Sequence, residues 1–165
     1  MAFIELGTLF LIGASLWIAF WAVFHTTRAL LRRRGHQLAR ELGIQVGAAE
    51  KQARRGGEME ALVTMSSTKE LGTVEVGVVC TESYDEEESD SDHHSYRTTS
   101  HATAHETWVP VESLEGSQSV RLSIPPEAPF SYKGNCLSFK WEVAARGRRA
   151  GQVDAEARSE FSVLP

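Results

Sequence analysis

Three patterns of apolar and polar positions follow one another along this chain. Residues 6–24 carry no charge, residues 28–53 repeat small and apolar side chains at roughly helical spacing, and beyond Gly57 apolar and polar residues alternate with a period of two. The first pattern is typical of a helix in lipid, the second of an exposed helix, and the third of half-buried strands. We therefore expect a helical region followed by an all-β domain.

The strand pattern is clearest on both sides of a proline-rich segment. Alternation runs from Ser117 to Ile124 and resumes from Leu137 to Arg146, where Trp141 falls on the apolar face. Prolines cannot donate to a sheet ladder, so the segment between is expected to cross from one strand to the next. Strands are predicted over residues 59–65, 73–84, 101–111, 117–124, 137–146 and 156–164. Strands in this number without an intervening helix predict two packed antiparallel sheets, a β-sandwich.

The uncharged run predicts a single transmembrane helix. The nineteen residues from Leu6 to Phe24 would span about 28 Å as a helix, close to the hydrocarbon thickness of a bilayer. The acidic start of the chain and the aromatic end of the run do not fit a cleaved signal peptide. Trp21 suits the interfacial belt. Ser15 and Ala19 form a small-residue pair through which two copies could associate as a homo-oligomer.

Basic residues beside this run predict its orientation. Arg28, Arg32, Arg33 and Arg34 follow it closely. Cationic residues next to a spanning helix stay on the cytoplasmic side, so we expect the amino terminus outside the cell membrane and the domain in the cytoplasm. These four arginines and Trp21 are the predicted membrane-interface residues. The arginines either set the topology alone or also attract anionic lipid headgroups.

Charge divides the chain into three regions. Residues 1–24 hold one charged residue, residues 25–57 have a net charge of +6, and residues 58–165 have a net charge of −10. We expect a short external tail and transmembrane helix over 1–24 and the sandwich over 58–165. Between them, 25–57 would be a basic juxtamembrane stalk, helical to about Ala53 and ended by two glycines. An acidic domain repels phosphate, which argues against nucleic acid as a partner.

The most polar stretch, at about residues 85–100, combines carboxylates with histidines. It is too charged to pack and is predicted to be a mobile loop. The candidate metal ligands in this stretch are His93, His94, Asp90 and Asp92, and two histidines that follow it, His101 and His105, could join them. Their spacing matches no closed zinc site, and a calcium loop would need glycine and a carboxylate where His93 and Thr99 stand. No metal or other cofactor is therefore predicted.

Catalytic signals are absent from the sequence. No nucleophile motif or phosphate-cradling glycine loop occurs, so we expect no enzyme. Cys80 is in phase with apolar strand positions, and its spacing from Trp108 and Cys136 does not fit an immunoglobulin disulfide. We expect free thiols, in keeping with a reducing compartment.

The residues around the proline-rich segment resemble the arrestin-like family. The resemblance rests on a strand, a proline-rich crossing, an S-(F/Y)-x-G turn and a second strand of the form V-R-Y-x-V-x-A. The residues that carry it are Pro125, Pro129, Ser131, Tyr132, Gly134 and Trp141. The resemblance implies an immunoglobulin-like sandwich lobe that binds partners and catalyses nothing. Members of the family usually carry two such lobes, and this chain has room for one.

Together these features predict a membrane-anchored, non-enzymatic binding or scaffold module. It would present an arrestin-like domain in the cytoplasm to another membrane protein, with an exposed sheet edge as the expected contact surface. One alternative is a metal-responsive sensor that acts through the acidic, histidine-containing stretch. Another is an accessory subunit whose transmembrane helix makes the specific contacts within a membrane complex.

Overall fold

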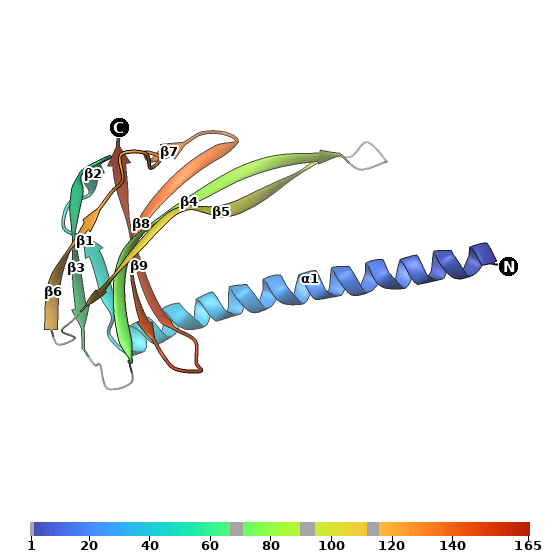
Figure 1. Cartoon of the computed structure of the whole chain (residues 1–165), viewed down its shortest axis with the longest axis horizontal. Helices are drawn as coiled ribbons and strands as arrows, with labels where there is room; N and C mark the ends of the chain where they lie inside the picture. Colours follow the sequence, from blue (N-terminus) through green and yellow to red (C-terminus); the bar gives the residue numbers. More distant parts are fainter. Residues whose placement is uncertain (1, 67–70, 90–94, 112–115) are drawn as a thin grey trace.

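The computed structural model describes residues 2–66, 71–89, 95–111 and 116–165, with side chains from Trp17 onward except those of 87–89, 95 and 96. One long helix, α1 (Ala2–Glu41), precedes two β-sheets (Figure 1). The smaller sheet has the order β1 (Gln45–Ala48), β3 (Glu58–Met65), β6 (Gly116–Ser123). The larger sheet has the order β2 (Gln52–Arg54), β9 (Ala155–Leu164), β8 (Leu137–Arg148), β4 (Thr73–Ser89), β5 (Ser95–Val111), and β7 (Tyr132–Lys133) also pairs with β8. The expected β-rich domain behind a single helix is confirmed.

Apolar side chains from both sheets form one core. Strand β3 buries every second residue, and in the facing sheet β4 and β8 bury their inner positions and some outer ones as well. The residues of these three strands that join the common core are Met59, Ala61, Val63, Met65, Val74, Val76, Val78, Cys80, Trp141, Val143 and Ala145. Alternation with a period of two places them on the inner faces. The two sheets therefore lie face to face around a common core, as a sandwich does.

Helix α1 ends inside the domain and not at a flexible joint. Gly43 has a φ of 65°, its N–H donates to the carbonyl of Arg40, and the N–H of Ile44 donates to the carbonyl of Ala39. These two bonds form a Schellman motif, in which glycine supplies the left-handed residue that ends a helix. Ala39 is only 2% exposed and Ile44 only 3% exposed, so the end of the helix is part of the core.

The stretch after Gly43 corrects the predicted stalk. Residues expected to remain helical to about Ala53 form β1, antiparallel to β3, and β2, parallel to β9. The helix therefore ends twelve residues early, at Glu41, and the sandwich takes in residues that were assigned to the stalk at 25–57. Alanine, glycine and glutamine have weak strand propensity, so only the pairing with neighbouring strands reveals these two elements.

Strands β4 and β5 form a hairpin that projects from the sandwich, on the same side as α1 (Figure 1). Their pairing continues to Ser89 and Ser95, with a bulge between Cys80 and Thr81. The loop predicted at about 85–100 is thus mostly paired strand, which is a correction. Residues 90–94 lie outside the described part of the chain. Strand β5 is the edge of the larger sheet.

In the part of the chain whose side chains are described, no helix carries an apolar stretch long enough to cross a membrane. The predicted span begins at Leu6, and the side chains of its residues before Trp17, Ser15 among them, lie outside the described residues.

Candidate functional site

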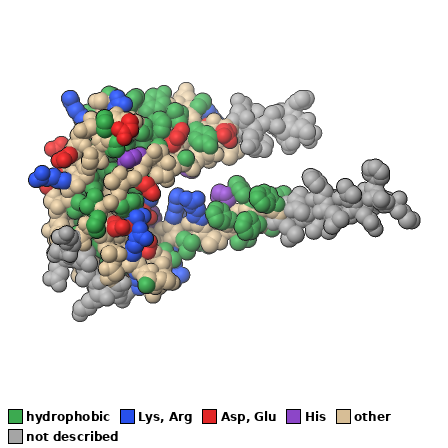
Figure 2. All heavy atoms as spheres, viewed as in Figure 1, with side chains coloured by type: hydrophobic (Ala, Val, Ile, Leu, Met, Phe, Trp, Pro, Cys, Tyr) green, Lys and Arg blue, Asp and Glu red, His purple; other side chains and the backbone are tan. Residues whose placement is uncertain are grey.

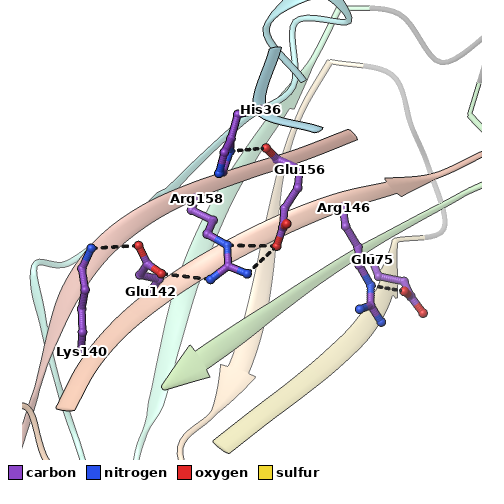
Figure 3. A network of polar contacts seen from close by, with 7 residues as sticks. All are labelled: His36, Glu75, Lys140, Glu142, Arg146, Glu156 and Arg158. Carbon is purple, nitrogen blue, oxygen red and sulfur yellow. Dashed lines mark hydrogen bonds and ion pairs between the residues drawn. The ribbon is translucent and has the colours of Figure 1, made fainter. Parts of the chain in front are cut away.

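The junction between α1 and the sandwich is built by a close backbone approach. A Cβ atom at Gly35 would lie 2.9 Å from the carbonyl oxygen of Asp154, so only glycine lets the helix come this near to the start of β9. At the next residue, His36 Nδ1 lies 2.9 Å from the carbonyl oxygen of Glu156 (Figure 3). Leu38 and Leu42 pack against the core beside Ala39. The helix is therefore fixed to the domain along its last two turns.

Beyond this junction the exposed surface of α1 changes from basic to apolar. The predicted membrane-interface residues Arg28, Arg32, Arg33 and Arg34 are all exposed on the helix. The next part of the helix carries exposed large apolar side chains, namely Trp17, Ile18, Phe20, Trp21, Val23 and Phe24. Figure 2 shows basic side chains nearest the sandwich, then histidine, then an apolar stretch. The ring of Trp21 also contacts that of His25 in a tilted arrangement, with ring centroids 4.0 Å apart.

A groove of about 610 Å³ lies where α1 meets the turn between β8 and β9. The helix contributes Leu31, Arg34 and Leu38, and the turn contributes residues 149–154. In the turn, the backbone N–H of Arg149 donates to Asp154 Oδ1 at 3.3 Å. The fold thus brings a second basic segment, Arg146–Arg149, to the same end of the domain as the basic residues of α1. Sequence reasoning missed this segment, although its three arginines around Gly147 were a visible signal.

A charged network covers the outer face of the larger sheet (Figure 3). Glu142 on β8 accepts from Lys140 and from Arg158, both at 3.0 Å, and Arg158 also contacts Glu156 at 2.7 Å. Partial burial alone would raise the pKa of Glu142, but the bonds from Lys140 and Arg158 hold that pKa below its usual value. The charge of Glu156 raises the pKa of Arg158 against the opposing effect of burial. Each charge has partners of opposite sign, so this network stabilises the sheet and offers no free acid or base.

A second group of the same face surrounds Trp108. Glu75 accepts from Arg146 at 2.7 Å and from Arg148 at 2.9 Å, and these bonds, that from Arg148 first, lower the pKa of Glu75. The guanidinium carbon of Arg146 lies 3.9 Å from the centroid of the Trp108 ring. That ring covers Gly77, where a Cβ atom would come within 2.9 Å of it. The buried Nε1 of Trp108 has no hydrogen-bond partner.

The residues of the proline-rich crossing hold the domain together. Trp141 is fully buried and donates from Nε1 to the carbonyl of Pro129 at 2.9 Å. Ser131 exchanges two bonds with β9, because its N–H donates to the carbonyl of Val163 and its Oγ accepts from the Val163 N–H. Two further bonds close turns, from Ala128 N–H to the Pro125 carbonyl and from Gly134 N–H to the Leu137 carbonyl. Tyr132, at 48% exposure, is the one exposed side chain among the six residues that carry the family resemblance.

Tyr132 borders an aromatic groove of about 670 Å³. Phe130, which is 39% exposed, meets Tyr132 edge to face with ring centroids 6.4 Å apart. Arg55 lies over the other aromatic ring, 5.5 Å from the Phe130 centroid. Leu137, Phe139, Ala104 and Ala128 complete the apolar lining. Aromatic side chains are enriched at protein interfaces, so this groove is a candidate contact surface.

The candidate metal ligands are not brought together. His101 Nδ1 bonds to Ser83 Oγ at 2.7 Å, whereas His105 contacts Thr107 Oγ1 at 3.0 Å and faces the ring of Trp141. His105 faces Trp141 and therefore lies on the core side of the hairpin. Ser83, the partner of His101, is three residues beyond buried Cys80, an odd number that places it on the other face. The two histidines therefore occupy opposite faces of the hairpin. His93, His94, Asp90 and Asp92 lie outside the described residues. Among the others, no group of three potential ligands is close enough to hold a metal.

Three possible nucleophiles, Ser83, Cys80 and Cys136, lie in the described part of the chain. The Ser83 and His101 pair has suitable atoms, but neither residue lines any of the four cavities described for this domain. Both cysteines are free, as predicted. Cys80 is buried, and desolvation, followed by the charge of Glu82, raises its pKa to about 11. Cys136 is exposed and is the accessible thiol of the pair.

Similarity to known structures is found at low sequence identity. The crystal structure of Spo0M, a sporulation control protein from Bacillus subtilis, matches 74% of this chain with a TM-score of 0.50 and 15% identity. The chain covers 49% of the Spo0M chain, about half its length. A β-glucosidase from Listeria innocua in complex with gluconolactone matches 74% of this chain and 16% of its own, with 14% identity and a TM-score of 0.31, which is too low to indicate a shared fold. No protein-family model and no curated protein matches the chain.

Proposed function

We propose that this protein is a membrane-anchored, non-enzymatic binding module of arrestin-like, immunoglobulin-like type. The observation that carries the proposal is the junction at Gly35, Ala39 and Ile44, which builds the end of α1 into the core of the sandwich. A helix fixed in this way transmits the position of its apolar part directly to the domain. An anchor and a presented domain would then behave as one body.

The surface of α1 supports a membrane as the site of anchoring. Exposed apolar side chains over Trp17–Phe24 continue an uncharged sequence that begins at Leu6, and arginines follow at once. This order is the one that a cytoplasmic membrane boundary favours. The domain would lie in the cytoplasm and the amino terminus outside.

The aromatic groove supports a protein as the partner. Phe130 and Tyr132 are exposed side by side on the domain, whereas the charged network of Figure 3 is satisfied internally. Aromatic side chains are enriched at the centres of protein interfaces. We propose that the groove contacts another membrane protein, which the crosslinking experiment below would identify.

Anchoring and topology can be tested with the chain's own accessible thiol. Membranes that carry the full chain are extracted with alkaline carbonate, and intact cells are treated with a membrane-impermeant maleimide before and after permeabilisation. We expect the protein to remain in the membrane pellet and Cys136 to be labelled only after permeabilisation, with Cys136→Ser as the unlabelled control. Release by carbonate would refute the anchor, and labelling of intact cells would refute the orientation.

Partner binding can be tested with a photo-crosslinking amino acid at Tyr132. The matched control carries the same amino acid at Arg121, an exposed position on β6. Adducts with one distinct membrane protein from position 132 alone would support the binding module. Adducts only between copies of this chain would replace it with a self-assembling structural role.

A further inference from the structure

The groove between α1 and the β8–β9 turn joins two basic segments that are far apart in the sequence. Arg34 enters it from the helix and Arg149 from the turn, and Leu31 lies beside them. The lining has one acidic residue, Asp154, whose Oδ1 accepts from the backbone of the turn. The groove therefore combines positive charge with an apolar side chain, which matches the chemistry of an anionic phospholipid headgroup and the start of its acyl chains.

The groove also lies at a suitable height along α1. Seven residues separate Phe24 from Leu31, a rise of about 10 Å. Headgroup layers add roughly 5–7 Å to each side of the hydrocarbon. With the apolar run in lipid, the groove would lie just above the headgroups, within reach of arginine side chains when the helix is tilted.

The projecting hairpin makes such a tilt necessary. It extends in the same direction as α1, so an upright helix would bring the hairpin, with the carboxylates of Glu82, Asp85 and Glu86, toward the membrane (Figure 1). The hairpin and the β8–β9 turn lie on opposite sides of α1 in this view. A tilt that lifts the hairpin off the bilayer therefore lowers the turn onto it. Transmembrane helices commonly tilt by about 20° and reach about 40°.

Electrostatics favours the same direction of tilt. Anionic lipids at the cytoplasmic surface repel the carboxylates of the hairpin and attract the arginines of the turn. We propose that the groove between Arg34 and Arg149 binds anionic phospholipid headgroups and so fixes the tilt of the anchored domain. This inference rests on the proposed membrane anchor and adds a second, headgroup-dependent contact to it.

The test places a reporter in the turn of the full-length protein. Gln152→Cys, in a Cys136→Ser background, is labelled with an environment-sensitive fluorophore, and buried Cys80 stays unlabelled. The protein is reconstituted into nanodiscs of phosphatidylcholine, with or without phosphatidylserine, that contain a lipid with a headgroup quencher. We expect quenching with phosphatidylserine, little quenching without it, and reversal by high salt.

Paired variants identify the arginines responsible. Arg34→Ala with Arg149→Ala should weaken the contact about fivefold for each arginine removed. The matched control, Arg54→Ala with Arg121→Ala, removes the same charge from a groove at the far end of β9 and should retain full quenching. Arg34→Ala alone, an exposed helix position, provides the same comparison if the double variant fails to fold.

Each remaining outcome decides the inference. Equal quenching in both lipids, or quenching that survives loss of Arg34 and Arg149, would overturn it while leaving the anchor intact. If millimolar inorganic phosphate, at constant ionic strength, abolishes the quenching in phosphatidylserine discs, the groove binds free phosphate and the lipid assignment is wrong. Failure of the protein to enter nanodiscs of either composition would overturn the anchor and this inference together.

Discussion

Helix α1 and the β4–β5 hairpin leave the sandwich on the same side but are supported in opposite ways. The helix is packed into the core at its base through Ala39 and Ile44, whereas the hairpin loses its buried side chains beyond Cys80. Past that residue the hairpin depends on strand pairing and on exposed polar contacts. We conclude that the helix moves with the domain, while the outer hairpin can change shape without cost to the core.

Removing Trp141 should have the largest effect on the stability of the sandwich core. Trp141→Ala deletes a fully buried side chain and its bond to the Pro129 carbonyl, and we expect a loss of about 3–5 kcal/mol in the free energy of unfolding. Urea denaturation of the full chain in detergent, followed by circular dichroism, measures it. The control Tyr132→Ala, at an exposed aromatic, should cost far less. Equal losses of unfolding free energy in the two variants would mean that buried Trp141 stabilises the domain no more than exposed Tyr132 does.

A smaller effect is expected at the base of the helix. Gly35→Ala places a methyl group against the Asp154 carbonyl, and overpacking of this kind costs about 1–3 kcal/mol, of which helix propensity recovers up to about 1. Gly47→Ala is the control, since a Cβ atom there meets nothing within 4 Å. Unfolding free energies of the two variants compare them. A stabilised Gly35→Ala protein would show that the helix is loosely attached.

Acid should weaken the charged network of the larger sheet. The pKa values of Glu75 and Glu142 are lowered from 4.5 in the folded protein, so their contribution is present above that pH and is lost as the pH falls through the folded values. Glu142→Gln should reduce stability at neutral pH by about 1 kcal/mol and flatten the fall in acid. Urea titrations at a series of pH values test this. If Glu142→Gln loses stability in acid as steeply as the unmodified protein does, the acid sensitivity comes from other groups.

The outer hairpin should show the smallest global change. Arg97 pairs with Asp85 at 3.2 Å and donates to the Asn135 carbonyl at 3.2 Å, with a side chain that is largely exposed. Arg97→Ala should change the free energy of unfolding by less than about 0.5 kcal/mol. Hydrogen exchange should nevertheless quicken for the amides of 81–86 and not for those of 74–80. Faster exchange in both ranges would mean that the hairpin and the core open together.

Alternation was enough to predict the strands that have one clearly buried face. β3, β6, β8 and β9 lie close to their predicted ranges because their inner positions are apolar. The extent of the other strands is set by the strands that pair with them. Glu86 and its acidic neighbours join a strand because β5 pairs with them, and residues 45–54 do so because β3 and β9 are adjacent.

The candidate site was less accessible to sequence reasoning. The arginines of α1 were found because they follow an apolar run, but their neighbour Arg149 is placed beside Arg34 only by the fold. Similarly, Phe130 and Arg55 are distant in sequence and meet at the aromatic groove. Local spacing holds no information about such pairs. The resemblance residues, by contrast, are already close together in the sequence, and in the structure most of them hold the proline-rich crossing in place.

The free edge of β5 has a consequence for solubility. A seventeen-residue strand at a sheet edge is a template on which other chains can add strands and aggregate. Pro110 removes one backbone donor, the bulge opposite Cys80 and Thr81 breaks the flat ladder, and charged Arg97 and Glu106 stand on the exposed strand. These features are those by which natural sheets discourage edge-to-edge association. Wherever many copies of the chain are crowded together, that protection would be required to keep the protein dispersed.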